Sequence, residues 1–418
     1  MSSDAPVIVV GAGLAGLACA QRLHRAGVEV VVLEASDGVG GRVRTDVVDG
    51  YRCDRGFQLL NPSYPVLPHL LGAGEDDHDG DGLAALDLRP FQAGTVVAHG
   101  RTRSVLADPR REPRLVAASL AAPVGTFAEK VRFAAWAAST LLPVRRQLAG
   151  EDRTWADELD AFGLTGRLRA GVLDPFLAGV LAEADGSSSA HLVRLLVRSF
   201  VLGSPSLPSL GMGRLPEVVA ATLPAGTVRL GVPVRGVTGT SVRTDGGDLA
   251  ARAVVVATDP TTAGRLTGVD APPMKALTTF WHTTEEPPTR RPLLHLDADH
   301  RGPVVNTAVM TNVAPSYAPA GRSLVATTVL GADGSAATER SAREQAGLVY
   351  GVGTASWRLV TAHVVAAALP AQPPPLRHRQ PVALGDGLFV AGDHRDTASI
   401  QGAAVSGRRA ADAVLAAS

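Results

Sequence analysis

Residues 7–34 read VIVVGAGLAGLACAQRLHRAGVEVVVLE, and this stretch decides the fold. A β-branched run ends at Gly11, apolar residues then recur at helical spacing up to Gly27, and a second apolar run follows. This order predicts a strand, a glycine turn, a helix and a strand, which together form a βαβ unit. The sequence therefore predicts an α/β protein with a parallel sheet of the Rossmann type.

The glycine turn has the spacing of a dinucleotide-binding motif. Gly11 permits the tight turn, Gly13 lets a pyrophosphate approach the backbone, and Gly16 lets the helix pack on the sheet. The helix N-terminus then faces the phosphates, and Glu34 is placed to accept hydrogen bonds from a ribose. A purely structural glycine turn is the alternative, but the strands, helix and terminal acid all favour dinucleotide binding.

A second glycine-rich segment, GVGGRVRT at residues 38–45, follows Glu34. Gly40 and Gly41 suit another close approach to the pyrophosphate, and the guanidinium of Arg42 would neutralise it. With the preceding motif, this segment resembles the flavin-dependent amine oxidase superfamily, which includes phytoene-type desaturases and protoporphyrinogen oxidase. The resemblance implies that the cofactor is FAD.

Two later parts of the chain carry the same resemblance. Residues 253–258 (AVVVAT) are similar to the family's strand ending at an Ala-Thr pair, here Ala257, and Val234 lies in a segment similar to the strand that meets the adenine. Residues 388–393 (LFVAGD) and 399–403 (SIQGA) resemble its second FAD motif. The resemblance places Gly392 and Asp393 at the ribityl or pyrophosphate region, and Ile400 and Gln401 at the pyrimidine edge of the flavin.

Candidate catalytic residues follow from the same comparison. Residues 54–58 (DRGFQ) stand where the family has a segment beside the isoalloxazine, so Gly56 is a candidate wall residue, although an ordinary strand and turn fits equally well. The catalytic candidates are Phe57, Gln58, His394, Arg395 and Gln401, with surface capping as the alternative for His394 and Arg395. Trp281 and His282 could face the substrate cavity, but an alternating core strand predicts the same pattern.

Some expected features are missing. The C-terminal motif holds no Cys, so we expect FAD to be bound non-covalently, and only Lys275 could serve as the lysine that many amine oxidases use.

Residues 77–82 match half of a calcium loop, but Leu88 stands where the bidentate Glu should be, so a solvated acidic loop is the better interpretation. The His residues are dispersed, and we expect no metal site.

Composition limits the class of protein. The 418 residues are enough for two domains, and 40 basic residues balance 40 acidic ones, which gives no ground for a nucleic-acid partner. We find no targeting segment and no uninterrupted apolar run long enough to span a membrane. The two cysteines, Cys19 and Cys53, have no metal or redox spacing, so we expect a cytoplasmic protein.

The sequence thus predicts a discontinuous FAD-binding domain interleaved with a mixed α+β substrate domain. The FAD domain is expected at residues 1–84, 205–262 and 381–418, and the substrate domain at 85–204 and 263–380. The expected activity is removal of a hydride equivalent from a small or apolar organic molecule. One alternative is a desaturase or isomerase of a polyene-like substrate, with the helical residues 115–148 forming a channel or touching a membrane surface. A non-catalytic FAD-binding protein is the other, and the oligomeric state stays open.

Overall fold

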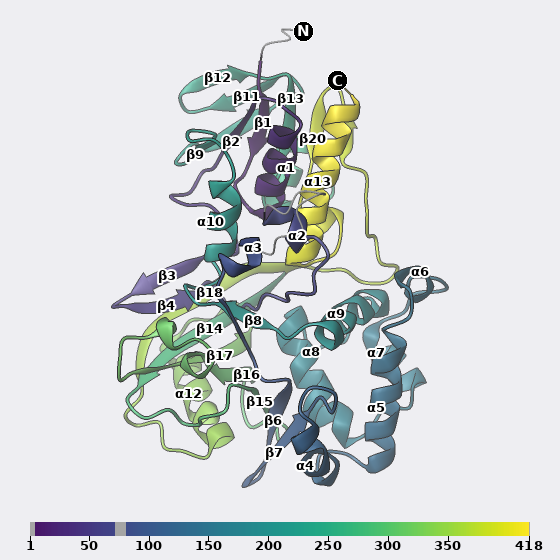
Figure 1. Ribbon diagram of the computed structural model, residues 1–418, viewed down its shortest axis with the longest axis vertical. Coiled ribbons are helices and arrows are strands. Elements are labelled where there is room, and N and C mark those ends of the chain that lie inside the picture. The colour runs from purple at the N-terminus through teal and green to yellow at the C-terminus, as the bar shows by residue number, and fades with distance from the viewer. Residues whose placement is uncertain (1–4, 72–80, 418) are drawn as a thin grey trace.

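The computed structural model describes residues 5–71 and 81–417, and two sheets organise it (Figure 1). The first sheet has the order β19-β20-β13-β1-β2-β9, with all neighbours parallel except β19 and β20. Its strands are β1 (Val7–Val10), β2 (Val30–Leu33), β9 (Val228–Arg229), β13 (Ala253–Val256), β19 (Ala383–Gly385) and β20 (Leu388–Val390). The predicted α/β class with a parallel sheet is confirmed.

Both faces of this sheet are covered, which explains why its central strands are uninterrupted apolar runs. Helices α1 (Leu14–Arg25), α10 (Arg214–Ala221) and α13 (Ile400–Ala416) contribute to the core on one face. The other face packs on α11 (Pro260–Thr267) and on a three-stranded sheet of β10 (Val234–Val237), β11 (Ser241–Thr244) and β12 (Gly247–Ala250). Helices α1 and α13 touch so closely that a Cβ on Gly407 would lie 2.0 Å from the carbonyl oxygen of Ala15.

The second sheet has the order β18-β14-β17-β16-β15-β6-β7. Its strands are β6 (Gly94–His99), β7 (Thr102–Ala107), β14 (Met274–Thr284), β15 (Leu294–Asp297), β16 (Val304–Val309), β17 (Ser323–Leu330) and β18 (Arg358–Pro370). Neighbouring strands of this sheet are antiparallel except β6 and β15, which are parallel. Helix α12 (Ala336–Tyr350) packs against it.

Helices α4 to α9 form a separate layer at the lower right of Figure 1. They are α4 (Val116–Ala121), α5 (Phe127–Ser139), α6 (Val144–Gln147), α7 (Trp155–Ala161), α8 (Asp174–Leu181) and α9 (Ala190–Leu202). Residues 115–148 are therefore mainly helical as predicted, but in several pieces. Pro123 and Pro143 stand in the breaks, where each lacks the amide that a continuous helix would need. Thr126 and Glu129 then form a capping box that starts α5.

Short elements connect the two sheets. The hairpin of β3 (Thr45–Val48) and β4 (Tyr51–Asp54) lies between them, as does the pair β5 (Leu88–Pro90) and β8 (Ser206–Pro208) (Figure 1). Two short helices, α2 (Leu67–Leu70) and α3 (Asp81–Ala84), flank the acidic stretch. Residues 72–80, and with them most of the segment compared with a calcium loop, lie outside the described residues.

Candidate functional site

The first glycine turn lies at the carboxyl end of β1, where three glycines have different surroundings. Gly11 has a φ of +104°, and a Cβ there would lie 2.8 Å from the carbonyl oxygen of Ala257. A Cβ on Gly16 would lie 1.9 Å from the carbonyl oxygen of Gly11. Gly13 differs, because its φ is −70° and a Cβ there would meet no atom within 4 Å. The chain's own packing requires glycine at Gly11 and Gly16, and it leaves open space at Gly13.

The second glycine segment faces the first. Gly40 donates its amide to the carbonyl oxygen of Ala12 at 2.8 Å, and Gly13 and Gly40 form an isolated parallel bridge. A Cβ on Gly41, where φ is +60°, would lie 3.4 Å from the Cα of Gly13. Two stretches of backbone without side chains therefore border the space beside Gly13.

The carboxylate of Glu34 lies at the same edge of the sheet. Its Oε2 accepts the amide of Ala12 at 2.7 Å, and its Oε1 accepts the amide and hydroxyl of Ser36 at 2.9 and 2.8 Å. The amide of Val232 donates to the Glu34 carbonyl at 2.8 Å. Val234, two residues further on, opens β10 and packs in the core against the far side of the sheet.

An ion pair joins the second glycine segment to the C-terminal motif. Arg42 donates from Nη2 to Asp393 Oδ1 at 2.7 Å, and from Nη1 to the Ala368 carbonyl at 2.8 Å. Burial alone would lower the pKa of the Arg42 guanidinium, but the Asp393 carboxylate more than offsets this and raises it. Arg42 is therefore a fixed positive charge within the second glycine segment.

His394 is the most unusual side chain of this region. It is 3% exposed, and neither ring nitrogen has a hydrogen-bond partner. The ring lies over Gly392, where a Cβ would come within 2.5 Å of it and where φ is +152°. Burial lowers the pKa of His394 to about 4, so the imidazole is neutral at pH 7. A buried, unpartnered imidazole is costly unless a ligand supplies the missing partner.

Arg395 and Gln401 are bonded to the protein itself. Arg395 donates from Nε and Nη2 to the Pro381 carbonyl at 3.2 and 2.5 Å. Its guanidinium is thus directed to the segment before β19. Arg395 is 8% exposed, so neither it nor His394 caps a surface.

Gln401 Oε1 accepts the amide of Val66 at 3.0 Å, in the loop before α2. Ile400 begins α13, which the Ser399 hydroxyl caps by accepting the amide of Gly402.

Gly56, Phe57 and Gln58 lie between the hairpin β3–β4 and the second sheet. Gly56 has a φ of +102°, and the amide of Phe57 donates to Thr279 Oγ1 at 3.1 Å. Gln58 Nε2 donates to the carbonyl oxygens of Arg42 and Arg55 at 2.7 and 2.9 Å. Its Oε1 is buried without a partner. The structure therefore brings Gln58 and the glycine segment of Arg42 together.

Trp281 and His282 point to opposite faces of β14, so they do not line one cavity together. Trp281 Nε1 donates to His363 Nδ1 at 3.0 Å, and His363 Nε2 donates to Asp46 Oδ2 at 3.0 Å. His282 Nε2 contacts Glu339 Oε1 of α12 at 2.8 Å. For this pair, the alternating core strand is the better interpretation.

Lys275 forms an ion pair away from the predicted flavin-binding residues. Its Nζ pairs with the carboxylate of Glu183 and donates to Ser188 Oγ at 2.8 Å. Glu183 Oε1 also accepts the indole N–H of Trp155 at 2.7 Å. The ammonium therefore ties β14 to the helical layer.

Sequence reasoning missed Asp54, which organises the hairpin next to the site. It accepts hydrogen bonds from the Thr45 hydroxyl at 2.5 Å, the Met212 amide at 2.9 Å and the Tyr317 hydroxyl at 2.9 Å. Burial raises the pKa of Asp54 to about 6 although these bonds favour the carboxylate. An acidic residue at the end of a strand usually lies in water, so no local signal marked it.

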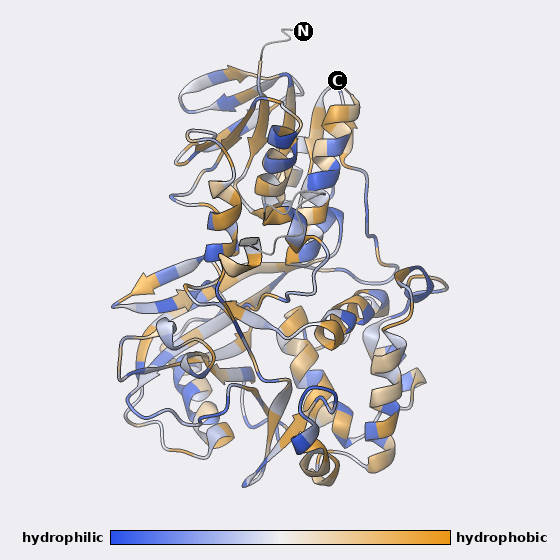
Figure 2. Cartoon of the chain, in the orientation of Figure 1, coloured by the Kyte–Doolittle hydropathy of each residue, from blue (hydrophilic) through white to orange (hydrophobic). Residues whose placement is uncertain are grey.

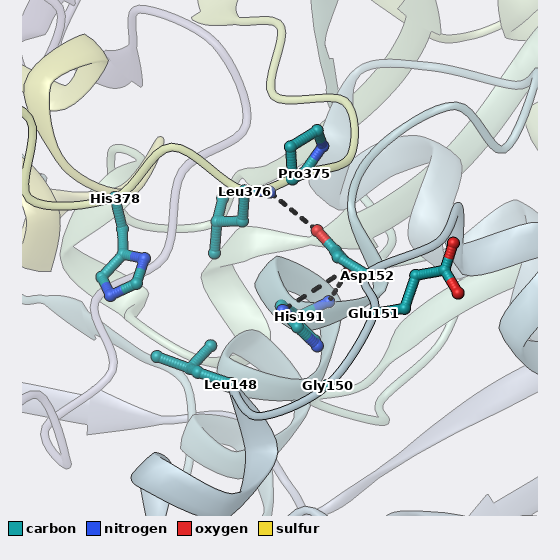
Figure 3. Close-up of a pocket in the computed structure, with 8 residues that line it drawn as sticks. All are labelled: Leu148, Gly150, Glu151, Asp152, His191, Pro375, Leu376 and His378. Carbon is teal, nitrogen blue, oxygen red and sulfur yellow. Dashed lines mark hydrogen bonds and ion pairs between the residues drawn. The ribbon is translucent and has the colours of Figure 1, made fainter.

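A cavity of about 430 Å³ lies apart from these residues, beside α6 and the segment before β19 (Figure 3). It is lined by Leu148, Gly150, Glu151, Asp152, His191, Pro375, Leu376 and His378. Asp152 Oδ2 accepts the Ser189 hydroxyl at 2.6 Å and the Leu376 amide at 2.8 Å. These bonds use the carboxylate to tie chain segments together, and none of the predicted site residues lines the cavity. Among the described residues, no cluster of His, Cys, Asp and Glu is arranged to hold a metal ion.

A parallel sheet, a glycine turn after β1 and an acid after β2 define a Rossmann-type nucleotide-binding fold. The flavin containing amine oxidoreductase family matches residues 14–415. The chain belongs to this family, whose members are flavin-dependent oxidoreductases. The superfamily expected from the sequence motifs is therefore confirmed.

Individual relatives match over shorter stretches. Polyamine oxidase 3 of Oryza sativa subsp. japonica is 38% identical over 100 residues, which are 20% of this chain and 21% of that protein. The 1-hydroxycarotenoid 3,4-desaturase of Flavobacterium sp. (strain P99-3) is 44% identical over 64 residues, 15% of this chain and 12% of that one. The matched stretch thus spans about a fifth or less of each of these two proteins.

A solved structure is similar over the whole fold. It is that of a putative protoporphyrinogen oxidase from Exiguobacterium sp. 255-15, with a TM-score of 0.71 and 16% identity over 100% of both chains. At this identity the likeness establishes the fold.

Proposed function

We propose that this protein binds FAD non-covalently and removes a hydride equivalent from a small or apolar organic substrate. The FAD domain would consist of residues 1–84, 205–262 and 381–418, and the substrate domain of the remaining segments. The proposal includes two further points: the flavin is FAD, and the substrate binds against its isoalloxazine ring.

The open space at Gly13 is the observation that carries the proposal. The protein's own packing gives no reason for glycine there, whereas a pyrophosphate lying against the backbone does. Arg42 would neutralise that pyrophosphate, and Glu34 would accept hydrogen bonds from the ribose. His394, Asp393 and Gln58 would face the rest of the cofactor, since two of them hold buried polar atoms without partners. These residues fit the group.

FAD, when bound, supplies a two-electron acceptor, which is the redox chemistry that the side chains lack. The chain's own residues would bind and orient the substrate and would exclude water. Phe57 is held by Thr279, and Gln58 by two carbonyls, so this wall is preorganised. His394 is neutral at pH 7, so it would donate one hydrogen bond and accept another. The bond between Trp281 and His363 uses Nδ1 as acceptor, which leaves the proton on Nε2, facing Asp46.

The buried cysteines support non-covalent binding. Cys19 and Cys53 are both free and buried, and burial raises the pKa of each thiol far above its usual range, so neither is a reactive thiolate. The C-terminal motif at residues 388–407 contains no cysteine.

The proposal is tested by the colour and the chemistry of the purified protein. Acid precipitation should release yellow FAD into the supernatant, and colour that stays with the precipitate would contradict non-covalent binding. In the absence of oxygen, a panel of small amines and apolar alcohols or hydrocarbons should include a compound that bleaches the flavin. A protein that holds FAD but is bleached by no member of a broad panel would point to the binding-only alternative.

A polyene desaturase is the second candidate. The desaturase relative favours it, as does the commitment of Lys275 to Glu183 away from the predicted flavin-binding residues. Bleaching by a detergent-dispersed carotenoid, but by no amine, would select this activity.

A further inference from the structure

Helices α4, α5 and α6, with the links between them, expose several large apolar side chains. Figure 2 shows much of α5 toward the hydrophobic end of the scale. Six of the 15 large hydrophobic side chains that are exposed in the described part of the chain fall within residues 120–144. We call these six the docking face: Leu120, Phe127, Val131, Leu141, Leu142 and Val144. Phe127 is 66% exposed and Val131 is 50% exposed.

The apolar side of α5 follows the helical period. Phe127, Val131, Ala134 and Ala138 lie on one exposed face at intervals of three or four residues. Trp136 lies on the opposite side and is buried among the helical layer. A helix that covers a core normally turns its charged side to water. In α5 both sides carry apolar residues, so the outer side is suited to an apolar environment.

Within residues 116–148 the outward-facing charges have one sign, although Arg146 also borders a cavity that Glu151, Asp152 and Glu158 line. Residues 116–148 contain the basic residues Lys130, Arg132, Arg145 and Arg146, and Glu129 is their one acidic residue. The Glu129 carboxylate is buried and accepts the amides of Thr126 and Leu168 at 2.7 and 3.2 Å. Lys130 donates to the carbonyls of Leu120 and Ala122, so its charge lies beside the face. The outward charge of this segment is therefore positive, although the whole chain has a net charge of zero.

We propose that the docking face binds an anionic phospholipid surface. Exposed Phe, Leu and Val side chains would enter the boundary between headgroups and acyl chains, while the flanking Arg and Lys contact the phosphates. A second copy of this chain fits less well. A two-fold interface would set the same positive segment against itself. The binding is peripheral, since no helix among residues 5–71 and 81–417 is long and apolar enough to cross a bilayer.

Vesicle sedimentation tests this surface without relying on the oxidoreductase activity. The holoprotein should sediment with vesicles of phosphatidylcholine and phosphatidylglycerol in equal parts, and stay in solution with phosphatidylcholine alone. High salt should release it. The double variant Phe127→Glu/Val131→Glu should lower the partition coefficient by about tenfold or more, because it places two negative charges at the interface. Arg145→Gln/Arg146→Gln should lower it by about tenfold as well, and Arg145→Lys/Arg146→Lys should not.

Val47→Glu is the matched control, since Val47 in β3 is also 66% exposed. It should bind vesicles like the unchanged protein, and flavin content should show that every variant is folded. The proposal is overturned if the unchanged protein stays in solution with both kinds of vesicle, or if the Phe127→Glu/Val131→Glu variant binds as well as Val47→Glu does. A dimer in light scattering that this double variant dissociates, without vesicle binding, would instead assign the face to self-association.

Discussion

At the scale of single residues, replacing Gly13 or Gly16 with alanine distinguishes the roles of these two glycines. Gly13→Ala should change the stability of the apoprotein by no more than about 1 kcal/mol, because its φ of −70° suits alanine and the added Cβ meets nothing. Its affinity for FAD should fall by at least about tenfold, since the methyl group would enter the pyrophosphate space. Gly16→Ala should cost about 3 kcal/mol of stability, because its Cβ would meet the Gly11 carbonyl at 1.9 Å. Urea unfolding and flavin titration measure both, and unchanged affinity in Gly13→Ala would remove this residue from the cofactor site.

Asp54 makes a prediction about pH. Its pKa is about 6 in the folded protein and 3.8 when unperturbed, so the folded state binds a proton more tightly than the unfolded state. The contribution of Asp54 to stability is therefore largest below pH 4 and is lost as the pH rises through 6. The stability of Asp54→Asn relative to the unchanged protein should be higher at pH 7 than at pH 4, by about 2 kcal/mol. Denaturant unfolding at several pH values checks this.

Asp46 provides a control of opposite sign. Burial tends to raise its pKa, but hydrogen bonds from Arg55 and His363 outweigh this and lower it. Asp46→Asn should therefore lose relative stability as the pH rises toward 3.8, and its relative stability should stay level between pH 4 and 7, where that of Asp54→Asn rises. Parallel slopes for the two variants would show that the assignment to Asp54 is wrong.

At the scale of elements, α13 connects the C-terminal motif to the loop before α2 through Gln401. Gln401→Leu would leave the Val66 amide without its acceptor, which should cost about 1–3 kcal/mol. If Gln401 also meets the pyrimidine edge of the flavin, the variant should lower the reduction potential by roughly 30 mV, which corresponds to one hydrogen bond to a charged group. Gln401→Glu retains the acceptor and controls for the Val66 bond. A potential that stays unchanged in Gln401→Leu would leave Gln401 as a structural tie.

The sequence predicted the elements whose pattern is local. The runs that became β1, β2 and β13 are buried on both faces, so each is apolar throughout. Strand β18 was not predicted, because many of its residues are half-exposed and its partner β14 lies about 80 residues away along the chain. The sequence shows prolines between residues 115 and 148, but we predicted one helical region there and did not predict that the prolines divide it into several helices.

The same limit applies to the site. The motifs single out Glu34, Arg42 and Asp393 as cofactor-binding candidates, because each has a defined spacing from a strand and a glycine turn along the chain. Tertiary contacts decide whether His394 is buried or exposed, and whether Arg395 turns to Pro381, so no pattern in residues 388–407 predicts either outcome.

At the scale of the whole molecule, the hairpin β3–β4 lies between the two sheets, next to the long strands β14 and β18 of the second sheet (Figure 1). The bond between Phe57 and Thr279 and the network of Trp281, His363 and Asp46 run across this junction. Substrate bound there would lie between the parallel first sheet and the second sheet.

This arrangement also bears on the source of electrons. The sequence has one glycine turn with the spacing of Gly11, Gly13 and Gly16 followed by a strand that ends in an acid, and the proposed FAD site uses this turn. In the described residues, the second sheet has a single parallel pair, β6 and β15, and almost 200 residues separate these strands along the chain. It therefore offers no compact βαβ unit for a second nucleotide. We expect NADH and NADPH to leave the flavin oxidised in anaerobic stopped-flow mixing, while dithionite bleaches it. Reduction by either nucleotide faster than roughly 1 s⁻¹, an ordinary turnover rate, would show that a second nucleotide site exists elsewhere in the fold.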